Sequence, residues 1–134
     1  MPGFHGKDLV FTWIWSGGTV QANTDFRSVD WNPTGDLYDQ TAGNDTHKTY
    51  IPGTKDCTIN FAALSQAGGT ALSTALAVNN SGTVIISPEG TAVGKRKITV
   101  PAYSQGAKES WPYDNLCEIS CAFQGNGAWT DASW

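Results

Sequence analysis

The sequence predicts a mainly β domain: a small β-sandwich or open barrel of about seven strands, flanked by one α-helix. Two segments, 55–63 and 115–124, alternate apolar and polar residues with the period of strands that bury one face. Turn-forming Gly, Pro and Asn recur between such segments, and only 15% of the residues are charged. One further stretch has the apolar spacing of an amphipathic helix. These patterns, with no linker in 134 residues, favour a single domain spanning residues 1–134.

The predicted strands are short runs of β-branched, aromatic or alternating residues bounded by turn residues. They fall at residues 8–14, 19–21, 26–31, 55–63, 83–87, 96–102 and 115–124. The segment Asn32-Pro33-Thr34-Gly35 predicts a turn, and residues 36–41 predict a short polar strand or a loop. Pro101 places the end of its strand at an edge or a bulge.

Three further segments are predicted to be irregular. Residues 42–48 are hydrophilic and predict a loop, residues 104–110 predict a polar loop, and residues 128–134 predict a short tail.

The two clearest strands specify which side chains point inward. In 55–63 the apolar positions are Cys57, Ile59 and Phe61, and the polar positions lie between them. In 115–124 the inward set is Cys117, Ile119, Cys121 and Phe123. Because successive strand residues face opposite sides, each strand buries one face and shows a polar one.

The helix is predicted at residues 70–78. Thr70 can cap its start, and Asn79 with Asn80 can end it. Its apolar stripe consists of Ala71, Leu72, Ala75, Leu76 and Val78. A single amphipathic helix cannot bury this stripe alone, so it is expected to lie against the sheet.

Charge and cysteine content exclude several classes of protein. The formal net charge is −4, and the densest basic run, Lys95-Arg96-Lys97, is expected to be a solvated or subunit-facing strand end, so a nucleic-acid-binding patch is absent. The three cysteines, an odd number, argue against a disulfide framework and are expected to be core thiols. The N-terminus shows no signal peptide and no stretch is long enough to span a membrane, so synthesis in a cytoplasm without membrane association is expected.

No catalytic or metal-binding pattern is present. The nucleophile, zinc-protease, phosphate-loop and dinucleotide motifs are all missing. His5 and His47 are expected to be surface residues, and the acidic positions between 25 and 39 do not form a calcium loop. We therefore expect no enzyme activity, no metal and no cofactor.

The tryptophans leave a binding function open. Aromatic residues dominate cores and subunit contacts, but an array of them can also stack on sugars. A soluble carbohydrate-binding β-sandwich module is therefore the alternative from another class. Its platform would come from Trp13, Trp15, Trp31, Trp111, Trp129 and Trp134.

Three sequence motifs, taken in chain order, narrow the range of possible functions. They are His5-Gly6-Lys7-Asp8, the block Lys48-Thr49-Tyr50-Ile51-Pro52-Gly53-Thr54-Lys55-Asp56-Cys57-Thr58-Ile59, and the closing Ala122-Phe123-Gln124-Gly125-Asn126-Gly127-Ala128. With the strand at 26–31 and the loop after it, they resemble the tail tube (major tail) proteins of long-tailed, siphovirus-like bacteriophages. The resemblance covers most of the chain, and the Tyr-Ile-Pro-Gly-x-Lys-Asp block is its most specific part. A tube of a contractile tail or injection machine, and a tail terminator, stay open as relatives.

The resemblance implies a structural subunit of the virion tail. Hexameric rings of the subunit would stack into a tube, assembled in the host cytoplasm, through which viral DNA reaches the host without specific binding. The implied partners are further copies of the chain, a tape measure protein, a tail terminator and distal tail or baseplate proteins.

The polar faces of the two alternating strands are the candidate channel lining. An acidic or neutral lining would let DNA slide, whereas a basic one would bind its phosphates. The candidate lumen residues are Asp56, Thr58, Asn60, Glu118, Ser120 and Gln124.

Contacts between stacked rings are expected from the N-terminal arm (1–7), a stacking loop (32–48) and the C-terminal tail (128–134). Repeated head-to-tail contacts of this kind propagate into filaments. The candidate stacking residues are His5, Lys7, Asp36, Tyr38, Asp45, His47, Trp129 and Trp134.

Overall fold

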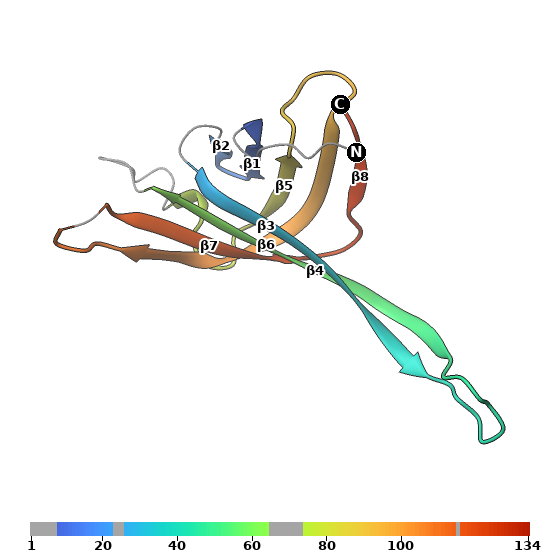
Figure 1. The fold of residues 1–134 in the computed structure, drawn as a ribbon. Helices are drawn as coiled ribbons and strands as arrows, with labels where there is room; N and C mark the ends of the chain where they lie inside the picture. Colours follow the sequence, from blue (N-terminus) through green and yellow to red (C-terminus); the bar gives the residue numbers. More distant parts are fainter. Residues whose placement is uncertain (1–7, 23–25, 65–73, 115) are drawn as a thin grey trace.

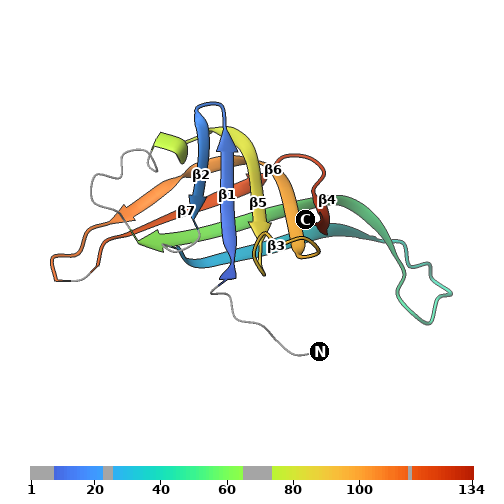
Figure 2. The same ribbon diagram turned by 90° about the horizontal axis from the view of Figure 1, so that it is seen from above.

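The computed structural model describes residues 8–22, 26–64, 74–114 and 116–134. The described residues form one antiparallel sheet in the order β2-β1-β5-β6-β7-β4-β3, with β8 paired to β6 (Figures 1 and 2). The strands are β1 (Val10–Trp15), β2 (Gly18–Ala22), β3 (Phe26–Asp39), β4 (Tyr50–Leu64), β5 (Ser81–Ser87), β6 (Arg96–Ser110), β7 (Glu118–Gly125) and β8 (Thr130–Ser133).

The long strand β6 lets one sheet wrap around its own core. Its first part pairs with β5, from Ile98 to Tyr103, and its second part pairs with β7, from Ala102 to Ser110. The change of partner turns β2, β1 and β5 over the inner face of β7, β4 and β3 (Figure 2). Because β2 and β3 end the sheet without pairing to each other, the result is an open barrel, as predicted.

The core lies between the two parts of this sheet. The Phe11 and Phe61 rings stack at a centroid distance of 4.4 Å, and Trp13 meets Phe123 at 4.8 Å. The indole N–H of the fully buried Trp13 donates to the carbonyl of Ala75 at 2.8 Å. This bond satisfies the one polar group of the side chain that would otherwise be buried at a cost.

The predicted faces of β4 and β7 are confirmed. Cys57, Ile59 and Phe61 on β4 are at most 2% exposed. On β7, Ile119, Cys121 and Phe123 are likewise buried. Cys117 precedes β7 and is half-buried. All three cysteines are free thiols.

The turn predicted at residues 32–35 is wrong, because these residues continue β3. Asn32, Pro33, Thr34 and Gly35 pair in register with Thr58, Cys57, Asp56 and Lys55 of β4. A proline is tolerated there because β3 is an edge strand and needs ladder bonds on one side only. The predicted strand at 26–31 and the polar segment after it are therefore a single strand, which ends at Asp39.

The loop predicted at residues 104–110 is also wrong, because these residues form the second half of β6. A bulge between Ser104 and Ala107, with Gly106 at φ +100°, shifts the register and breaks the alternation visible in the sequence. Pro101 does not end the strand. It lies between the segment paired with β8 and the segment paired with β7, where its carbonyl accepts from the Asn126 N–H.

The predicted helix lies partly outside the described residues, which begin again at Thr74. Thr74 and Ala75 form a helical turn, and Ala75 and Leu76 are buried in the core as predicted. Asn79, at φ +64°, ends the turn in the left-handed region that asparagine tolerates. The prediction that Val78 belongs to the buried stripe is wrong, because its side chain is 68% exposed in the single chain.

The C-terminal segment is an element of the sheet and not a simple tail. Thr130–Ser133 form β8, which pairs with Thr99 to Arg96 of β6. The Trp134 backbone N–H then donates to the Lys95 carbonyl at 2.9 Å, so the hydrogen bonding continues one residue past β8.

Candidate assembly surfaces

The six predicted lumen residues lie on one face of two neighbouring strands. β4 carries Asp56, Thr58 and Asn60, and β7 carries Glu118, Ser120 and Gln124. Thr58 is the register partner of Gln124, and residues directly opposite in an antiparallel pair point to the same side. The face opposite the core is therefore a polar surface, as the alternation predicted. We call it the polar face.

Hydrogen bonds and an ion pair join the strands across the polar face. The side-chain amide of Gln124 donates to the Asp56 carboxylate at 2.7 Å and to the Cys57 carbonyl at 3.3 Å. Arg27 of β3 forms an ion pair with Glu118 of β7. These contacts keep the polar side chains ordered and partly neutralise their charge.

Sequence reasoning missed other members of the polar face. Asp30 on β3 is the register partner of Asn60, and Lys108 on β6 is the partner of Ser120. Lys108 was hidden because its segment was predicted to be a loop. The face is thus mixed in charge, with Arg27 and Lys108 beside the acidic side chains, and not purely neutral or acidic as expected.

Two strands of the polar face have an open edge. β3 pairs with β4 alone, which leaves one side of a strand of 14 residues unpaired. β6 beyond Ser104 is paired to β7 on one side, and no described strand flanks it on the other. Unpaired edges of this length offer a template for another chain and are normally covered in native proteins.

The segment predicted as a stacking loop is the far end of a projecting hairpin. β3 and β4 continue past the body of the sheet and form an arm, defined here as residues 36–53 (Figure 1). The predicted loop, residues 32–48, contains the end of β3 and the turn of this arm. The ladder continues into the turn, where the Gln40 N–H donates to the Thr49 carbonyl at 2.9 Å.

The arm exposes apolar side chains on both faces. Tyr38 pairs with Ile51, and their side chains are 59% and 50% exposed. Leu37, on the opposite face, is 65% exposed. The Tyr38 ring covers Gly53, where an added Cβ would lie 2.5 Å from a ring carbon. Exposed apolar side chains on both faces make the arm a candidate contact surface.

Polar contacts order the arm and its turn. The Thr54 hydroxyl donates to the Asp36 carboxylate at 3.0 Å, and the Ala42 N–H donates to Asp45 at 2.8 Å. Hydrogen bonds from the side chain and backbone of Thr41 hold the pKa of Asp39 below its ordinary value. The predicted stacking residues Asp36, Tyr38, Asp45 and His47 therefore all lie on the arm, exposed.

The two predicted C-terminal stacking residues make contacts within the chain. The ring of Trp129 meets Trp31 edge-on at 5.5 Å. The Trp134 indole donates to the buried Ser87 hydroxyl at 3.1 Å, and the Lys97 ammonium lies 4.2 Å from its ring centroid. His5 and Lys7, with the N-terminal arm 1–7, lie outside the described residues.

The basic run at 95–97 has internal partners. Arg96 forms a bidentate ion pair with Asp131 of β8, and this pair raises the pKa of Arg96 and lowers that of Asp131. Lys97 packs over Trp134. The prediction of a strand end in place of a phosphate site agrees with these contacts.

The tryptophans do not form a common sugar-binding platform. Trp13 is fully buried, Trp31 and Trp129 pack edge to face against each other, and the Lys97 ammonium lies over the Trp134 ring. Trp111 is exposed, but it lies in the turn between β6 and β7, away from the others.

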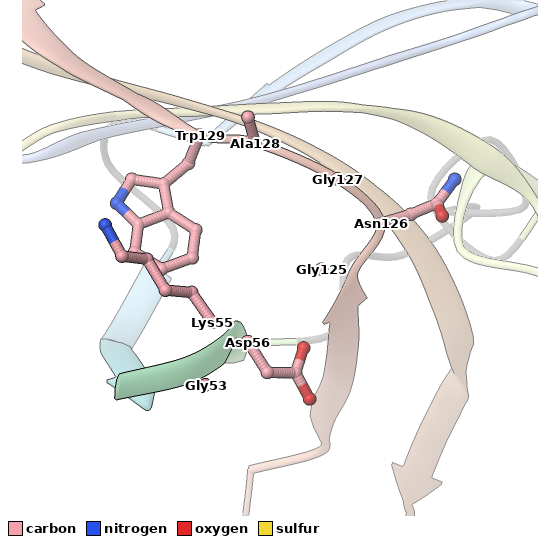
Figure 3. A pocket seen from close by; sticks show the side chains of 8 residues that line it. All are labelled: Gly53, Lys55, Asp56, Gly125, Asn126, Gly127, Ala128 and Trp129. Atoms are coloured by element: carbon pink, nitrogen blue, oxygen red, sulfur yellow. The ribbon is translucent and has the colours of Figure 1, made fainter. Parts of the chain in front are cut away.

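A groove of about 600 Å³ lies where the arm leaves the body (Figure 3). One wall is β4 from Gly53 to Asp56, and the other is the segment 125–129 that links β7 to β8. Figure 3 shows Lys55 and Trp129 along one side of the opening and Asn126 on the other. Gly125 must be glycine here, because a Cβ would lie 2.1 Å from the Cys57 sulfur.

The described part of the chain has few side chains arranged to bind a metal or to act as nucleophiles. No three His, Cys, Asp or Glu residues gather there as metal ligands would. Desolvation raises the pKa of the Cys121 thiol, although a hydrogen bond with Ser104 opposes the shift. A raised pKa disfavours the reactive thiolate. Within the same described ranges, no helix has the length and hydropathy needed to cross a bilayer.

No protein-family model matches the chain, and no curated protein matches its sequence. Solved structures do match its fold. The tail of an empty gene transfer agent particle, refined with C6 helical symmetry, has a TM-score of 0.75 at 11% identity and covers 98% of this chain and 100% of that one. The SPP1 tail tube has a TM-score of 0.71 at 11% identity, covering 98% and 80%.

A third match is the sheath-tube complex of an extracellular contractile injection system, in its extended state. It has a TM-score of 0.65 at 13% identity and covers 92% of this chain and 88% of that one. The chain therefore has the fold of tail tube proteins, the fold that the sequence motifs implied.

Proposed function

We propose that this chain is the structural subunit of a phage-like tail tube. Copies of it form hexameric rings, and the rings stack into a hollow cylinder that delivers DNA, with no catalytic step and no cofactor. The observation that carries the proposal is the combination of a polar face bordered by two open edges with a projecting apolar arm. The fold shared with the gene transfer agent tail and the SPP1 tail tube supports it.

Ring closure follows from the open edges. The outer edge of β3 pairs with the outer edge of β6, beyond Ser104, of the neighbouring copy. Continued around the ring, this pairing makes one closed barrel and leaves no exposed strand edge. The polar face then lines the channel with Asp56, Thr58, Asn60, Glu118, Ser120 and Gln124, together with Asp30 and Lys108.

Stacking follows from the arm. Leu37, Tyr38 and Ile51 bury their apolar surface against the next ring, and Asp36, Asp45 and His47 lie around them. The N-terminal residues His5 and Lys7 and the C-terminal residues Trp129 and Trp134 contribute to the same contact. A tape measure protein inside the channel, a terminator at one end and distal tail or baseplate proteins at the other complete the tail in the virion.

Electron microscopy of the purified chain over a range of concentrations tests the proposal. We expect hollow tubes or rings with sixfold symmetry. A variant that lacks residues 38–51 and joins the register partners Leu37 and Pro52 through a two-residue turn removes most of the arm and no core residue. Its unfolding free energy should match that of the parent. It should form single rings or smaller particles, but no tubes. Small particles at every concentration from the full chain would reject the proposal.

A further inference from the structure

An aromatic tip lies at the opposite end of the molecule from the arm. Residues 111–114, here called the tip, belong to the turn between β6 and β7 (Figures 1 and 2). Trp111 is 70% exposed and Tyr113 is exposed completely. Neither side chain takes part in the proposed lumen or in the stacking contact of the arm. Trp and Tyr are the residues most enriched at the energetic centres of protein interfaces.

β7 connects the tip to the groove at the root of the arm. The strand begins at Glu118, four residues after the tip, and ends at Gly125 in the groove wall. A subunit thus carries a projection at one end of β7 and a recess at the other. A projection at one end of a chain and a recess at the other can form a heterologous, head-to-tail contact. Such a contact repeats from copy to copy.

Charge favours the same pairing. Lys55 points from β4 into the groove region and has no ion-pair or hydrogen-bond partner among the described residues. Asp56, the acid beside it, is already held by Gln124 and by the Cys57 N–H. The tip carries the single charged residue Asp114, an acid. These neutral donors leave the negative charge of Asp56 in place, so the groove holds one cation and one acid. Lys55 is the cation in its lining with which Asp114 of another copy can pair.

The groove also has room for an aromatic side chain. Its volume of about 600 Å³ lies within the range of roughly 300–1,000 Å³ that ligand pockets span. The glycines at 53, 125 and 127 add no side chains to its walls, and Trp129 offers an aromatic surface against which a ring can pack.

We propose that the groove is the docking site for the tip of a second copy of this chain, in the adjacent ring. Trp111 and Tyr113 enter the groove beside Trp129, and Asp114 pairs with Lys55. The inference rests on the proposed tube and adds a contact between rings at the root of the arm, made by the tip of the other copy.

Disulfide trapping tests the contact. In a Cys117→Ser background, the double variant Tyr113→Cys with Ala128→Cys is assembled and oxidised. We expect most of the chain to run as a covalent ladder on denaturing gels. The matched control is Val93→Cys with Ala128→Cys, which pairs the groove with an exposed residue of the β5–β6 loop and should give no ladder. Tubes that form without a ladder from the 113/128 pair would overturn the inference alone.

A charge swap tests the same contact without new cysteines. Lys55→Asp and Asp114→Lys should each raise the critical concentration for assembly about tenfold, and the double variant should return it to the parent value. Lys95→Asp and Glu89→Lys are the matched charge controls and should leave it unchanged. If the charge swaps and their controls changed the critical concentration equally, the pairing of Lys55 with Asp114 would be rejected. Absence of tubes from the unmodified chain would instead reject the tube proposal, and this inference with it.

Discussion

The side-chain amide of Gln124 donates a 2.7 Å hydrogen bond to the Asp56 carboxylate and so ties β7 to β4 on the polar face. The same amide reaches the Cys57 carbonyl at 3.3 Å, and Asp56 also accepts from the Cys57 N–H at 2.8 Å. At this end of the polar face, the Asp56 and Gln124 side chains are therefore held by hydrogen bonds and are not independent solvated groups.

The first prediction concerns this bond. Gln124→Ala and Asp56→Ala should show a coupling of about 0.5–1 kcal/mol in the free energy of unfolding, since a net hydrogen bond contributes about that much. Urea denaturation of both single variants and the double variant measures the coupling. Asp56→Asn keeps an acceptor oxygen and is the control, with a smaller loss. Strictly additive effects would show that the bond contributes nothing.

The second prediction concerns the charge of the polar face. Tubes of the parent chain should not retain DNA, whereas tubes of the triple variant Asp56→Lys, Asn60→Lys and Ser120→Lys should. Lysines that bind DNA phosphates release the counterions condensed on them, and this release drives binding. Binding should fall steeply with salt in a filter or gel-shift assay. Three lysines at 91–93, in the β5–β6 loop, are the control. DNA retention by both variants alike would argue against a channel lined by this face.

The third prediction concerns the core. Trp13→Phe removes the indole donor to the Ala75 carbonyl, which keeps the Asn80 amide as its other donor, and leaves a void in a fully buried site. The expected loss in the free energy of unfolding is about 2–4 kcal/mol. Trp111→Phe, at an exposed position, should change it by less than about 0.5 kcal/mol. Chemical denaturation of the monomer distinguishes the two, and equal losses would contradict the packing described.

The fourth prediction concerns the close approach of β7 to β4. Gly125→Ala places a methyl group 2.1 Å from the Cys57 sulfur and should cost about 1–3 kcal/mol by overpacking. Cys57→Ala removes that sulfur, so the double variant should be more stable than the sum of the two losses implies. Denaturation of the four proteins completes the cycle. If the losses in unfolding free energy were additive, the clash with the Cys57 sulfur would not be the cause of the destabilisation by Gly125→Ala.

The fifth prediction concerns pH. The Arg96 guanidinium holds the pKa of Asp131 below its ordinary value in the folded chain. The folded state therefore binds this proton less readily than the unfolded state, so the pair stabilises the fold above the ordinary carboxyl pKa of about 4 and the effect is lost as pH falls through the folded pKa. Because the pair is half exposed, its contribution should stay below about 1 kcal/mol.

Asp131→Asn tests the assignment. Its unfolding free energy should depend less on pH in the acid range than that of the parent. Asp114→Asn, at an exposed tip residue with no ion pair, is the control and should leave the dependence unchanged. If Asp131→Asn and the parent show the same pH dependence of the unfolding free energy in the acid range, the ion pair is not the source of that dependence.

The sequence by itself determined the strand character of β4 and β7 and the side of the sheet that each of their residues takes. Alternation is a local property: once Ile59 is buried, Thr58 and Asn60 must face the other way. The six polar-face candidates followed from this rule, and the motifs around residues 48–59 and 123–127 indicated the fold that the solved structures share.

Only the tertiary structure decided where the strands end and which segments meet. The turn residues at 32–35 stay extended because β4 supplies a register partner for each of them, and residues 104–110 stay extended because β7 does so past a bulge. The partner strands are tens of residues away in sequence, so local propensity could not reveal the pairing. For the same reason, the sequence did not reveal three features that depend on strand pairing. They are Lys108 on the polar face, β8 beside β6, and the groove between Lys55 and Trp129.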